Sequence, residues 1–418
     1  MKVFKFGGAS IKNAQSIRNM TDIIHSYHGE DIAIVVSAMG KTTNHLENMF
    51  HKIISNEDCK IEFSQLVNYH ESIISDLFKK NASEVIQKVG IYFDEIRTLI
   101  NKNSNYNTED KFYDALVSFG EIISSSIIAE YLTYSGITTT WVDARKLIVT
   151  DQTFREGKID WDITAKKISN TIGPILMTNP VLTQGFLGAT TQGETTTLGR
   201  EGSDFSAAIL AFSLDAESVT IWKDVPGILN ADPKRFEDTE LYNNLSYQEA
   251  AEMTYYGASV IHPKTIKPLA NKNIPLYVKS FEKPTLSGTL INLGTSHALP
   301  PTYVIKDNQS LISFGVKDLT FINEKNLSII FHILDKLNIK INMMQNSAVT
   351  FTICVDNKKD KVLKLLEILK NDFIIRYNDN LQLVTVKNYN QIAIDKVTSS
   401  KDVLVEQRTR NTYQIVIK

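Results

Sequence analysis

The chain has 418 residues, more than a single hydrophobic core usually supports, so two or three domains are expected. Its 43% hydrophobic and 22% charged residues are ordinary for a soluble globular protein. The formal net charge of -2, from 45 basic and 47 acidic residues, predicts no basic stripe for a nucleic acid or an anionic membrane.

The two cysteines, Cys59 and Cys354, are too far apart in the chain for a disulfide framework or a cysteine-rich metal site. Both are expected to be buried apolar residues. No apolar run is judged long enough to span a bilayer, and the N-terminus has no signal-peptide pattern. We therefore expect a cytoplasmic protein without a membrane partner.

Short apolar runs typical of buried strands recur along the first 290 residues or so: VFKF, IAIVVS, TTTWVD, PILMTNPVLTQGF, SVTIW and IPLYV. Helical periodicity fills the intervals, as in NAQSIRNMTDIIHSY and FYDALVSFGEIISSSIIAEYL. Strands that alternate with helices predict an α/β fold, a mostly parallel sheet sandwiched by helices. Ligands of such sheets bind at the carboxyl ends of the strands.

Residues 41–134 are nearly all helical in pattern, apart from the polar stretch NKNSNYNTED, and predict a helical excursion over the sheet. The Gly-, Ser- and Pro-containing stretch LGTSHALPPT predicts a linker. A first domain at 1–295 and a boundary near residue 300 follow.

Residues 305–388 predict a small α+β domain in the order strand, helix, strand, strand, helix, strand, strand, with FIIRY and LQLVTV as the last two strands. The remaining segment, 389–418, contains one clear strand, TYQIVIK. It is too short for an independent core and is expected to add strands to a neighbouring sheet.

The opening stretch KFGGAS places Lys5 at the end of a strand, followed by Gly7 and Gly8 at the start of a helix. Backbone N–H groups at such a turn can hold an anion. Glycines let a phosphate approach the main chain. The spacing is not that of a P-loop, and an ordinary turn is the commoner meaning of so short a motif.

The stretch TQGFLGATTQGETTTLGREGSDFSAAILA predicts a hairpin through Gln192 and Gly193, and then a helix with Ser203 as its N-cap. Arg200 in the glycine turn offers a planar fork for a carboxylate. The alternative is a surface arginine in a glycine loop.

The stretch IWKDVPGILNADPKRFED predicts a buried strand followed by a loop with two turns. The charged residues of this loop suit a nucleotide, and a solvated turn is an equally good interpretation of the spacing alone.

Together these stretches resemble a known family. KFGGAS, VVSAMGKTTN, SFGE, TQGF, TTTLGREGSD, WKDVPGILNADP and EMTYYGASVIHPKTIKPL occur in the order seen in aspartate kinases, of the amino acid kinase family. The resemblance covers Lys5 to about Asn292, and residues 305–388 resemble the ACT regulatory domain of the same enzymes, with 389–418 as a shortened second ACT-like segment.

The resemblance implies phosphoryl transfer from ATP, carried with Mg²⁺, to the side-chain carboxylate of L-aspartate. The product is 4-phospho-L-aspartate, the first intermediate on the way to lysine, threonine and methionine. A carboxylate is already ionised at neutral pH and needs no general base, so the enzyme has to align two anions and neutralise charge. No histidine lies in the motifs, and no residue is assigned as a protein ligand of a metal.

The resemblance also implies roles for individual residues. Lys5 contacts the phosphates and the transferring phosphoryl group, beside Gly7 and Gly8, and Asp204 holds Lys5 in place. The aspartate pocket is expected to contain Ser37, Thr43, Glu121, Phe186, Arg200 and Ser203, with Glu121 on the substrate ammonium and Arg200 on a carboxylate. The nucleotide is expected to be bordered by Lys223, Asp224, Leu229, Lys234 and Ser259.

Several positions depart from the family pattern. Ala9 replaces a threonine, and Glu201 replaces a glycine and is expected to point outward. Lys223, Leu229 and Lys234 stand where Thr, Tyr and Arg are frequent, and Ser259 replaces a lysine whose loss Lys223 could offset.

The candidate effector-site residues in the loop of the ACT region are Asn342, Asn346 and Ser347. Asn342, Asn346 and Ala348 occupy positions where lysine-sensitive relatives carry acidic or hydroxyl residues, so weak or absent inhibition by lysine is expected. A homodimer is expected from the ACT region. Two alternatives are a kinase for another carboxylate or for carbamate, and a non-catalytic amino-acid sensor.

Overall fold

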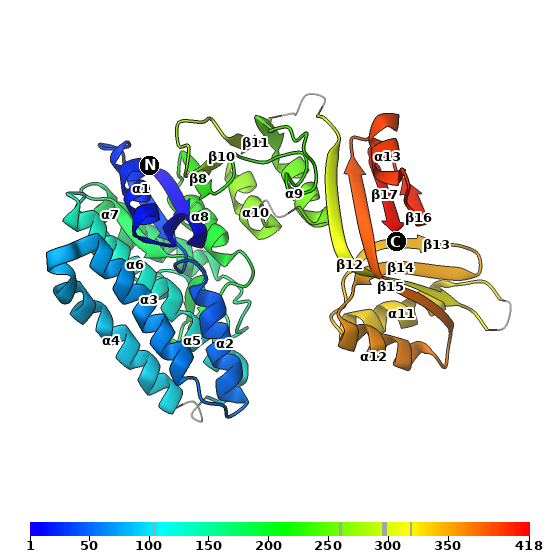
Figure 1. The fold of residues 1–418 in the computed structure, drawn as a ribbon, viewed down its shortest axis with the longest axis horizontal. Coiled ribbons are helices and arrows are strands. Elements are labelled where there is room, and N and C mark those ends of the chain that lie inside the picture. Colours follow the sequence, from blue (N-terminus) through cyan, green and yellow to red (C-terminus); the bar gives the residue numbers. More distant parts are fainter. Residues whose placement is uncertain (103–105, 259–260, 295–298, 318–319) are drawn as a thin grey trace. The chain divides into compact units, whose positions relative to one another are not determined.

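The structure is a computed structural model that describes residues 1–418 except 103–105, 259–260, 295–298 and 318–319 (Figure 1). The chain forms two compact units. The first comprises Met1–Ile228, Leu241–Ala251 and Val260–Thr295, and the second comprises Leu229–Glu240, Glu252–Ser259 and Ser296–Lys418. Two short segments inside the predicted first domain thus belong to the second unit.

The first unit is built on an eight-stranded sheet in the order β3-β5-β2-β1-β8-β10-β11-β9. All neighbours run parallel except β10 and β11, which confirms the predicted mostly parallel sheet. The strands are β1 (Lys2–Phe6), β2 (Ile32–Val36), β3 (Thr140–Val142), β5 (Val181–Gln184), β8 (Ser218–Lys223), β9 (Asn244–Ser246), β10 (Leu276–Ser280) and β11 (Thr289–Asn292).

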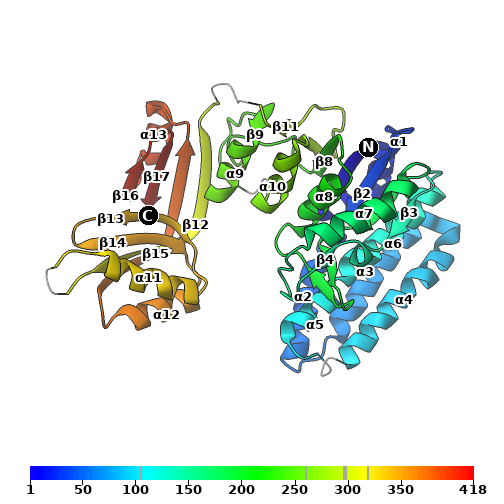
Figure 2. The same cartoon turned by 180° about the vertical axis from the view of Figure 1, so that it is seen from behind.

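Helices cover both faces of this sheet (Figures 1 and 2). The helices α7 (Trp161–Leu176), α8 (Gly202–Ser213) and α10 (Pro263–Lys272) lie on one face, with α8 packed against β1, β2 and β8. The opposite face is covered by α1 (Ala14–His25) and by helices of the helical excursion. A further helix, α9, spans Tyr247–Tyr256.

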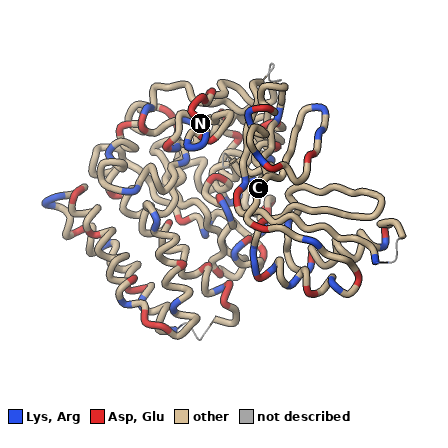
Figure 3. Tube along the Cα trace, turned by 45° about the vertical axis from the view of Figure 1, so that its right-hand side comes forward, with Lys and Arg blue, Asp and Glu red and all other residues tan. Residues whose placement is uncertain are grey.

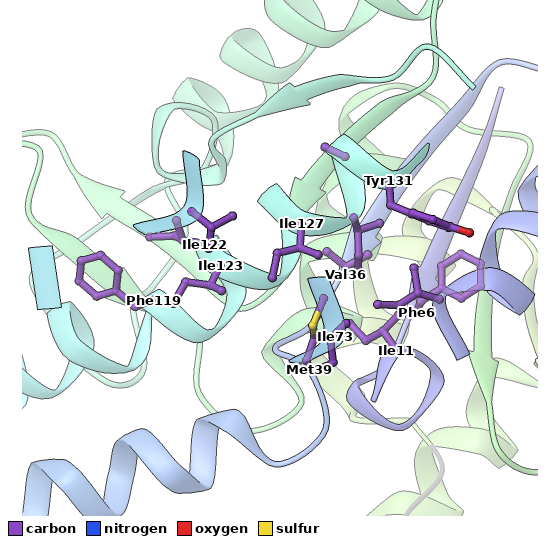
Figure 4. Close-up of a cluster of buried hydrophobic side chains, with 14 of the residues drawn as sticks. Phe6, Ile11, Val36, Met39, Ile73, Phe119, Ile122, Ile123, Ile127 and Tyr131 are labelled. Atoms are coloured by element: carbon purple, nitrogen blue, oxygen red, sulfur yellow. The ribbon is translucent and has the colours of Figure 1, made fainter. Parts of the chain in front are cut away.

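The helical excursion is confirmed as α2 (Thr42–Ile54), α3 (Lys60–Phe78), α4 (Ala82–Asn101), α5 (Glu109–Val117) and α6 (Phe119–Tyr134). Its side chains join the sheet in one core (Figure 4): Ile123 and Ile127 of α6 and Ile73 of α3 belong to the same buried cluster as Phe6 and Val36 of the strands. This shared burial fixes the excursion on the sheet.

One segment corrects the expectation that no apolar run could span a bilayer. The stretch Glu109–Tyr134 is long and apolar enough by length and composition, but 78% of its apolar window is buried inside the fold. Because both α5 and α6 contribute to the core, this apolarity is explained by packing.

The run PILMTNPVLTQGF, predicted as one strand, is divided between two elements. Its first residues complete α7, which ends at Leu176, and β5 begins at Val181. A short apolar run is compatible with a buried helix and with a buried strand, because hydrophobic periodicity alone does not distinguish the two.

The first unit also contains a small second sheet in the order β4-β6-β7. Its strands are β4 (Val149–Thr150), β6 (Leu187–Thr190) and β7 (Thr195–Thr197). The strands β6 and β7 form the predicted antiparallel hairpin, and Gly193 in its turn has φ = 82°. This conformation suits glycine.

The second unit contains a six-stranded sheet in the order β13-β14-β12-β15-β17-β16, in which all pairs are antiparallel. Its elements are β12 (Thr302–Gly315), α11 (Glu324–Lys336), β13 (Ile341–Asn346), β14 (Thr350–Asp356), α12 (Lys359–Leu369), β15 (Ile374–Lys387), α13 (Gln391–Thr398), β16 (Val403–Arg408) and β17 (Thr412–Ile417). The predicted α+β character of the C-terminal region is confirmed.

The two strands expected from FIIRY and LQLVTV are one strand, β15. The polar residues between them form a β-bulge region, where the register against β12 shifts and where Asn308 and Asn380 have positive φ. A bulge absorbs the turn-forming residues without ending the strand.

The last residues do add strands to the sheet, since β17 pairs with β15. They also form β16 and α13, which the sequence did not predict, and α13 packs Ala393, Ile394 and Val397 in a small core with Ile415. Basic and acidic residues are interspersed along the chain in both units (Figure 3).

Candidate active site

A cleft of about 630 Å³ opens at the carboxyl ends of the central strands of the first unit. Lys5 at the end of β1, Ser37 after β2, Phe186 after β5 and Lys223 at the end of β8 all line it. This is the edge at which parallel sheets collect ligands.

The KFGGAS turn is packed against the loop that follows β2. A Cβ atom on Gly8 would lie 2.8 Å from the carbonyl oxygen of Ala38 and 2.9 Å from that of Gly40, and Gly40 N–H donates to Gly8 O at 3.0 Å. Ser10 Oγ donates to the Trp222 carbonyl at 3.2 Å and so ties the turn to β8. Gly8 lines the cleft, whereas Gly7 does not.

A buried carboxylate lies between two lysines in the cleft. The Lys5 ammonium lies 2.5 Å from Oδ1 of Asp204 and the Lys223 ammonium lies 3.8 Å from Oδ2. Burial acts to raise the pKa of Asp204, but the positive charges of Lys5 and Lys223 outweigh it and lower the pKa. The cluster therefore carries an excess positive charge at the cleft.

Glu121, in the first turn of α6, presents a carboxylate oxygen to the cleft. Its Oε1 accepts from Ala38 N–H at 3.2 Å, while Oε2 is buried and has no hydrogen-bond partner among the residues that the structure describes. Burial raises the pKa of Glu121 to about 8, although the Ala38 N–H and Lys5 act to lower it. A cationic group entering the cleft would satisfy this carboxylate.

Substrate binding through Glu121 should therefore depend on pH. An ammonium ligand needs the ionised carboxylate, and with a pKa near 8 the free protein has to release a proton on binding below that pH. For L-aspartate, the substrate that the sequence resemblance implies, we expect the KM to fall by up to about tenfold per pH unit between pH 6.5 and 8, and then to level off.

The measurement is aspartate saturation over pH 6 to 9, with Glu121→Gln as the control. The variant should bind aspartate weakly at every pH, with no slope in this window. A wild-type KM that stays constant from pH 6.5 to 8 would contradict the assignment.

The turn before α8 brings Arg200, Glu201 and Ser203 to the cleft. The predicted N-cap role of Ser203 is wrong, because α8 begins at Gly202 and Glu201 occupies the N-cap position. The backbone of Phe186 has φ = 68°, an unusual conformation for a bulky residue, and its N–H donates to Ser206 Oγ at 2.9 Å. These contacts hold Phe186 and α8 together at the rim.

The expectation that Glu201 points outward is also wrong. Glu201 lines the cleft, and its Oε2 is buried with no hydrogen-bond partner in the described part of the chain. Gly202, the next residue, is so close to Phe186 that a Cβ there would lie 2.7 Å from the ring. The turn is therefore packed down against the cleft and not directed into solvent.

Five further polar residues of the cleft were not predicted: Glu47, Tyr113, Arg155, Glu156 and Thr197. Two of them, Arg155 and Thr197, are held by the fully buried Asp114. One of its oxygens accepts from Arg155 N–H and Thr197 N–H at 2.9 Å each, and the other accepts from Thr197 Oγ1 at 2.8 Å. The only sequence signal was a charged residue inside an apolar helix, in FYDALV.

Loss of this carboxylate should destabilise the fold. In Asp114→Ala two backbone N–H groups lose their buried acceptor, and we expect the free energy of unfolding to fall by ~2–4 kcal/mol. Urea unfolding measures the change. Asp110→Ala is the matched control. Among the described residues this exposed carboxylate pairs with the Arg155 side chain, and its loss should cost less than ~1 kcal/mol. Equal losses in the two variants would refute the organising role.

Only some of the residues predicted to bind the nucleotide lie at the cleft. Lys223 lines the cleft, whereas Asp224 is exposed and does not. Leu229 and Lys234 belong to the second unit, and Ser259 lies outside the described residues. Thr43, predicted to belong to the aspartate pocket, lines the cleft.

The effector candidates of the second unit occupy two environments. Asn342 donates to Gln309 Oε1 and to Asp356 Oδ1 at 2.8 Å each, and accepts from Lys306 Nζ at 2.8 Å. Asn346 is exposed at the end of β13, and Ser347 Oγ donates to Thr350 O at 3.0 Å in the following turn. Asn342 is thus engaged in an internal network.

The fold and the cleft define an α/β protein in which two lysines and a buried carboxylate lie together at the carboxyl edge of a mostly parallel sheet. A sequence profile described as the amino acid kinase family matches residues 1–280. The chain therefore belongs to the amino acid kinase family.

The chain is 31% identical over 358 residues to the lysine-sensitive aspartokinase 3 of Escherichia coli (strain K12). The matched region covers 85% of this chain and 78% of that protein. It is 30% identical over 396 residues to the bifunctional aspartokinase/homoserine dehydrogenase of Buchnera aphidicola, covering 91% of this chain and 47% of that protein. The chain thus spans about half the length of the bifunctional relative.

The structure is also similar to the crystal structure of E. coli aspartokinase III in complex with aspartate and ADP. The TM-score is 0.83 and the sequence identity is 27%, with 100% of this chain and 96% of that chain covered.

Proposed function

We propose that this protein is an ATP-dependent aspartate kinase, which transfers the γ-phosphoryl group of ATP to the side-chain carboxylate of L-aspartate. The observation that carries the proposal is the cluster in which Asp204 lies between the Lys5 and Lys223 ammonium groups at the carboxyl edge of the sheet. The relatives named aspartokinase, and the similar structure that holds aspartate and ADP, support the choice of substrates.

The reaction needs charge to be neutralised and two anions to be aligned. The bond between the γ-phosphorus and the bridging oxygen of ATP breaks while a bond to the aspartate carboxylate oxygen forms, and no proton is transferred. Lys5 and Lys223 both line the cleft, and in this proposal they stabilise the negative charge of the transferring group. Asp204 keeps both ammonium groups oriented and is not needed as a base.

The cleft offers complementary groups for each part of the amino acid. Oε2 of Glu121 has no partner and suits the substrate ammonium. Arg200 is exposed in the rim turn and suits the carboxylate that is not phosphorylated. Ser37, Thr43 and Ser203 supply hydroxyl groups around them.

Magnesium is expected with the nucleotide, where it neutralises phosphate charge. The residues fit such a group, because the cleft combines lysines for the phosphates with a buried carboxylate oxygen that lacks a partner on Glu201. The chain then needs few metal ligands of its own, since Mg²⁺ in kinase sites is held by one or two carboxylates plus phosphate and water.

An amino-acid effector at the second unit, a homodimer and a cytoplasmic location stay predictions. The edge strand β13 supports pairing between copies of the chain, because it is unpaired on one side and its Met344 is 51% exposed.

The test of the main proposal is a hydroxamate assay with ATP, Mg²⁺ and L-aspartate, in which hydroxylamine traps the acyl phosphate. Aspartate-dependent hydroxamate is expected, with none from N-acetylglutamate. No hydroxamate with aspartate would refute the proposal and would favour a non-catalytic sensor.

A further inference from the structure

Glu201 has a backbone conformation that is unfavourable for its residue type. Its φ and ψ are 55° and 27°, in the left-handed region that favours glycine. It occupies the N-cap position of α8, yet its side chain makes no capping hydrogen bond. The strain therefore has no explanation in helix capping, and residues held in such conformations at a cleft are candidates for a functional role.

The carboxylate of Glu201 is incompletely satisfied. Its Oε2 is buried and has no hydrogen-bond partner within the described chain, while the side chain lines the same cleft as Lys5 and Lys223. Between this carboxylate and the phosphates of a bound nucleotide the interaction would be repulsive unless a cation lay between them.

The other carboxylates of the cleft are less suited to face a cation at the phosphates. Asp204 is held by two lysines, and Glu47 accepts a hydrogen bond from the Tyr113 hydroxyl. Glu121 lies on α6 and suits the substrate ammonium, and Glu156 is exposed. Glu201 is thus the carboxylate on the Asp204 side of the cleft with a buried oxygen still to be satisfied.

We propose that Glu201 supplies a carboxylate ligand, direct or through water, for the divalent cation that accompanies the nucleotide. This inference rests on the proposed use of ATP and adds a role for the chain's own residue in holding the metal. Magnesium prefers oxygen ligands and bridges carboxylates to phosphates, so one cation satisfies Oε2 and removes the repulsion. In its absence the carboxylate weakens nucleotide binding.

The experiment is calorimetric titration of ADP into the full-length protein, once with excess EDTA and once with excess Mg²⁺. We expect Mg²⁺ to lower the Kd for ADP by at least about tenfold in the wild type. In Glu201→Gln and Glu201→Gly the ratio should shrink to about threefold or less, because the repulsion and the ligand are removed together. Metal-free ADP should bind the variants more tightly than the wild type.

Glu156→Gln is the matched control, since it also removes a cleft carboxylate, and it should keep the wild-type ratio. Glu201→Gly should be at least as thermally stable as the wild type, because glycine relieves the left-handed strain. Its thermal stability therefore distinguishes loss of the metal ligand from misfolding.

An unchanged Mg²⁺ ratio in both Glu201 variants would overturn the inference and leave the kinase proposal intact. A wild-type protein that binds ADP neither with nor without Mg²⁺ would instead overturn the proposed function.

Discussion

Lys5→Ala is expected to lower kcat about 10³-fold, with a change in the KM for aspartate of less than about fivefold. The Lys5 ammonium lies against Asp204 in the cleft. In the proposed reaction, charge on the transferring phosphoryl group develops beside it. An interaction made chiefly in the transition state affects turnover far more than substrate binding. Steady-state kinetics with aspartate and ATP varied separately measures both constants.

Lys279→Ala is a suitable control for Lys5→Ala. Lys279 is a partly buried lysine near the end of β10, in the same sheet, and does not line the cleft. Its loss should leave kcat within about twofold of the wild type. If Lys5→Ala raised only the aspartate KM, the phosphoryl role would be wrong, and Lys5 would have to be reassigned to the amino-acid pocket.

Arg200→Ala is expected to raise the KM for aspartate about 10- to 150-fold. Arg200 has no ion pair with a carboxylate among the described residues, and its guanidinium can bind a substrate carboxylate with two hydrogen bonds. A charge-assisted pair of this kind contributes ~1.5–3 kcal/mol. Aspartate saturation curves at fixed MgATP measure the change.

The conservative variant tests geometry apart from charge. Arg200→Lys retains the charge but loses the planar fork, so it should recover only part of the affinity. Arg145→Ala is the control, because Arg145 pairs with Asp143 and does not line the cleft. An unchanged aspartate KM in Arg200→Ala would remove this residue from the pocket.

The turn KFGGAS shows why one short motif could not be interpreted alone. The same two glycines suit an anion cradle and an ordinary close turn, and the structure gives Gly8 a packing reason for being glycine, its contact with Ala38 O and Gly40 O. What distinguishes a functional turn is the partner of Lys5, and Asp204 is 199 positions later in the chain.

Two predictions are wrong because tertiary contacts override the preference of the local sequence. Asparagine-rich residues between FIIRY and LQLVTV predict a turn, yet pairing with β12 carries β15 through them as a bulge. Glu201 was expected to point outward because a carboxylate beside an anion site is unfavourable. In the fold the turn packs against Phe186, and the side chain lies in the cleft.

Periodicity in the sequence predicts the alternation of strands and helices, the helical excursion and the small C-terminal domain. Most of the polar residues of the cleft come from the family resemblance, which rests on motifs that are contiguous in the chain. Which residues share a site is visible only in the folded chain. Asp114 illustrates the reason: its three donors come from segments about 40 and 80 residues away, a distance over which local patterns carry no information.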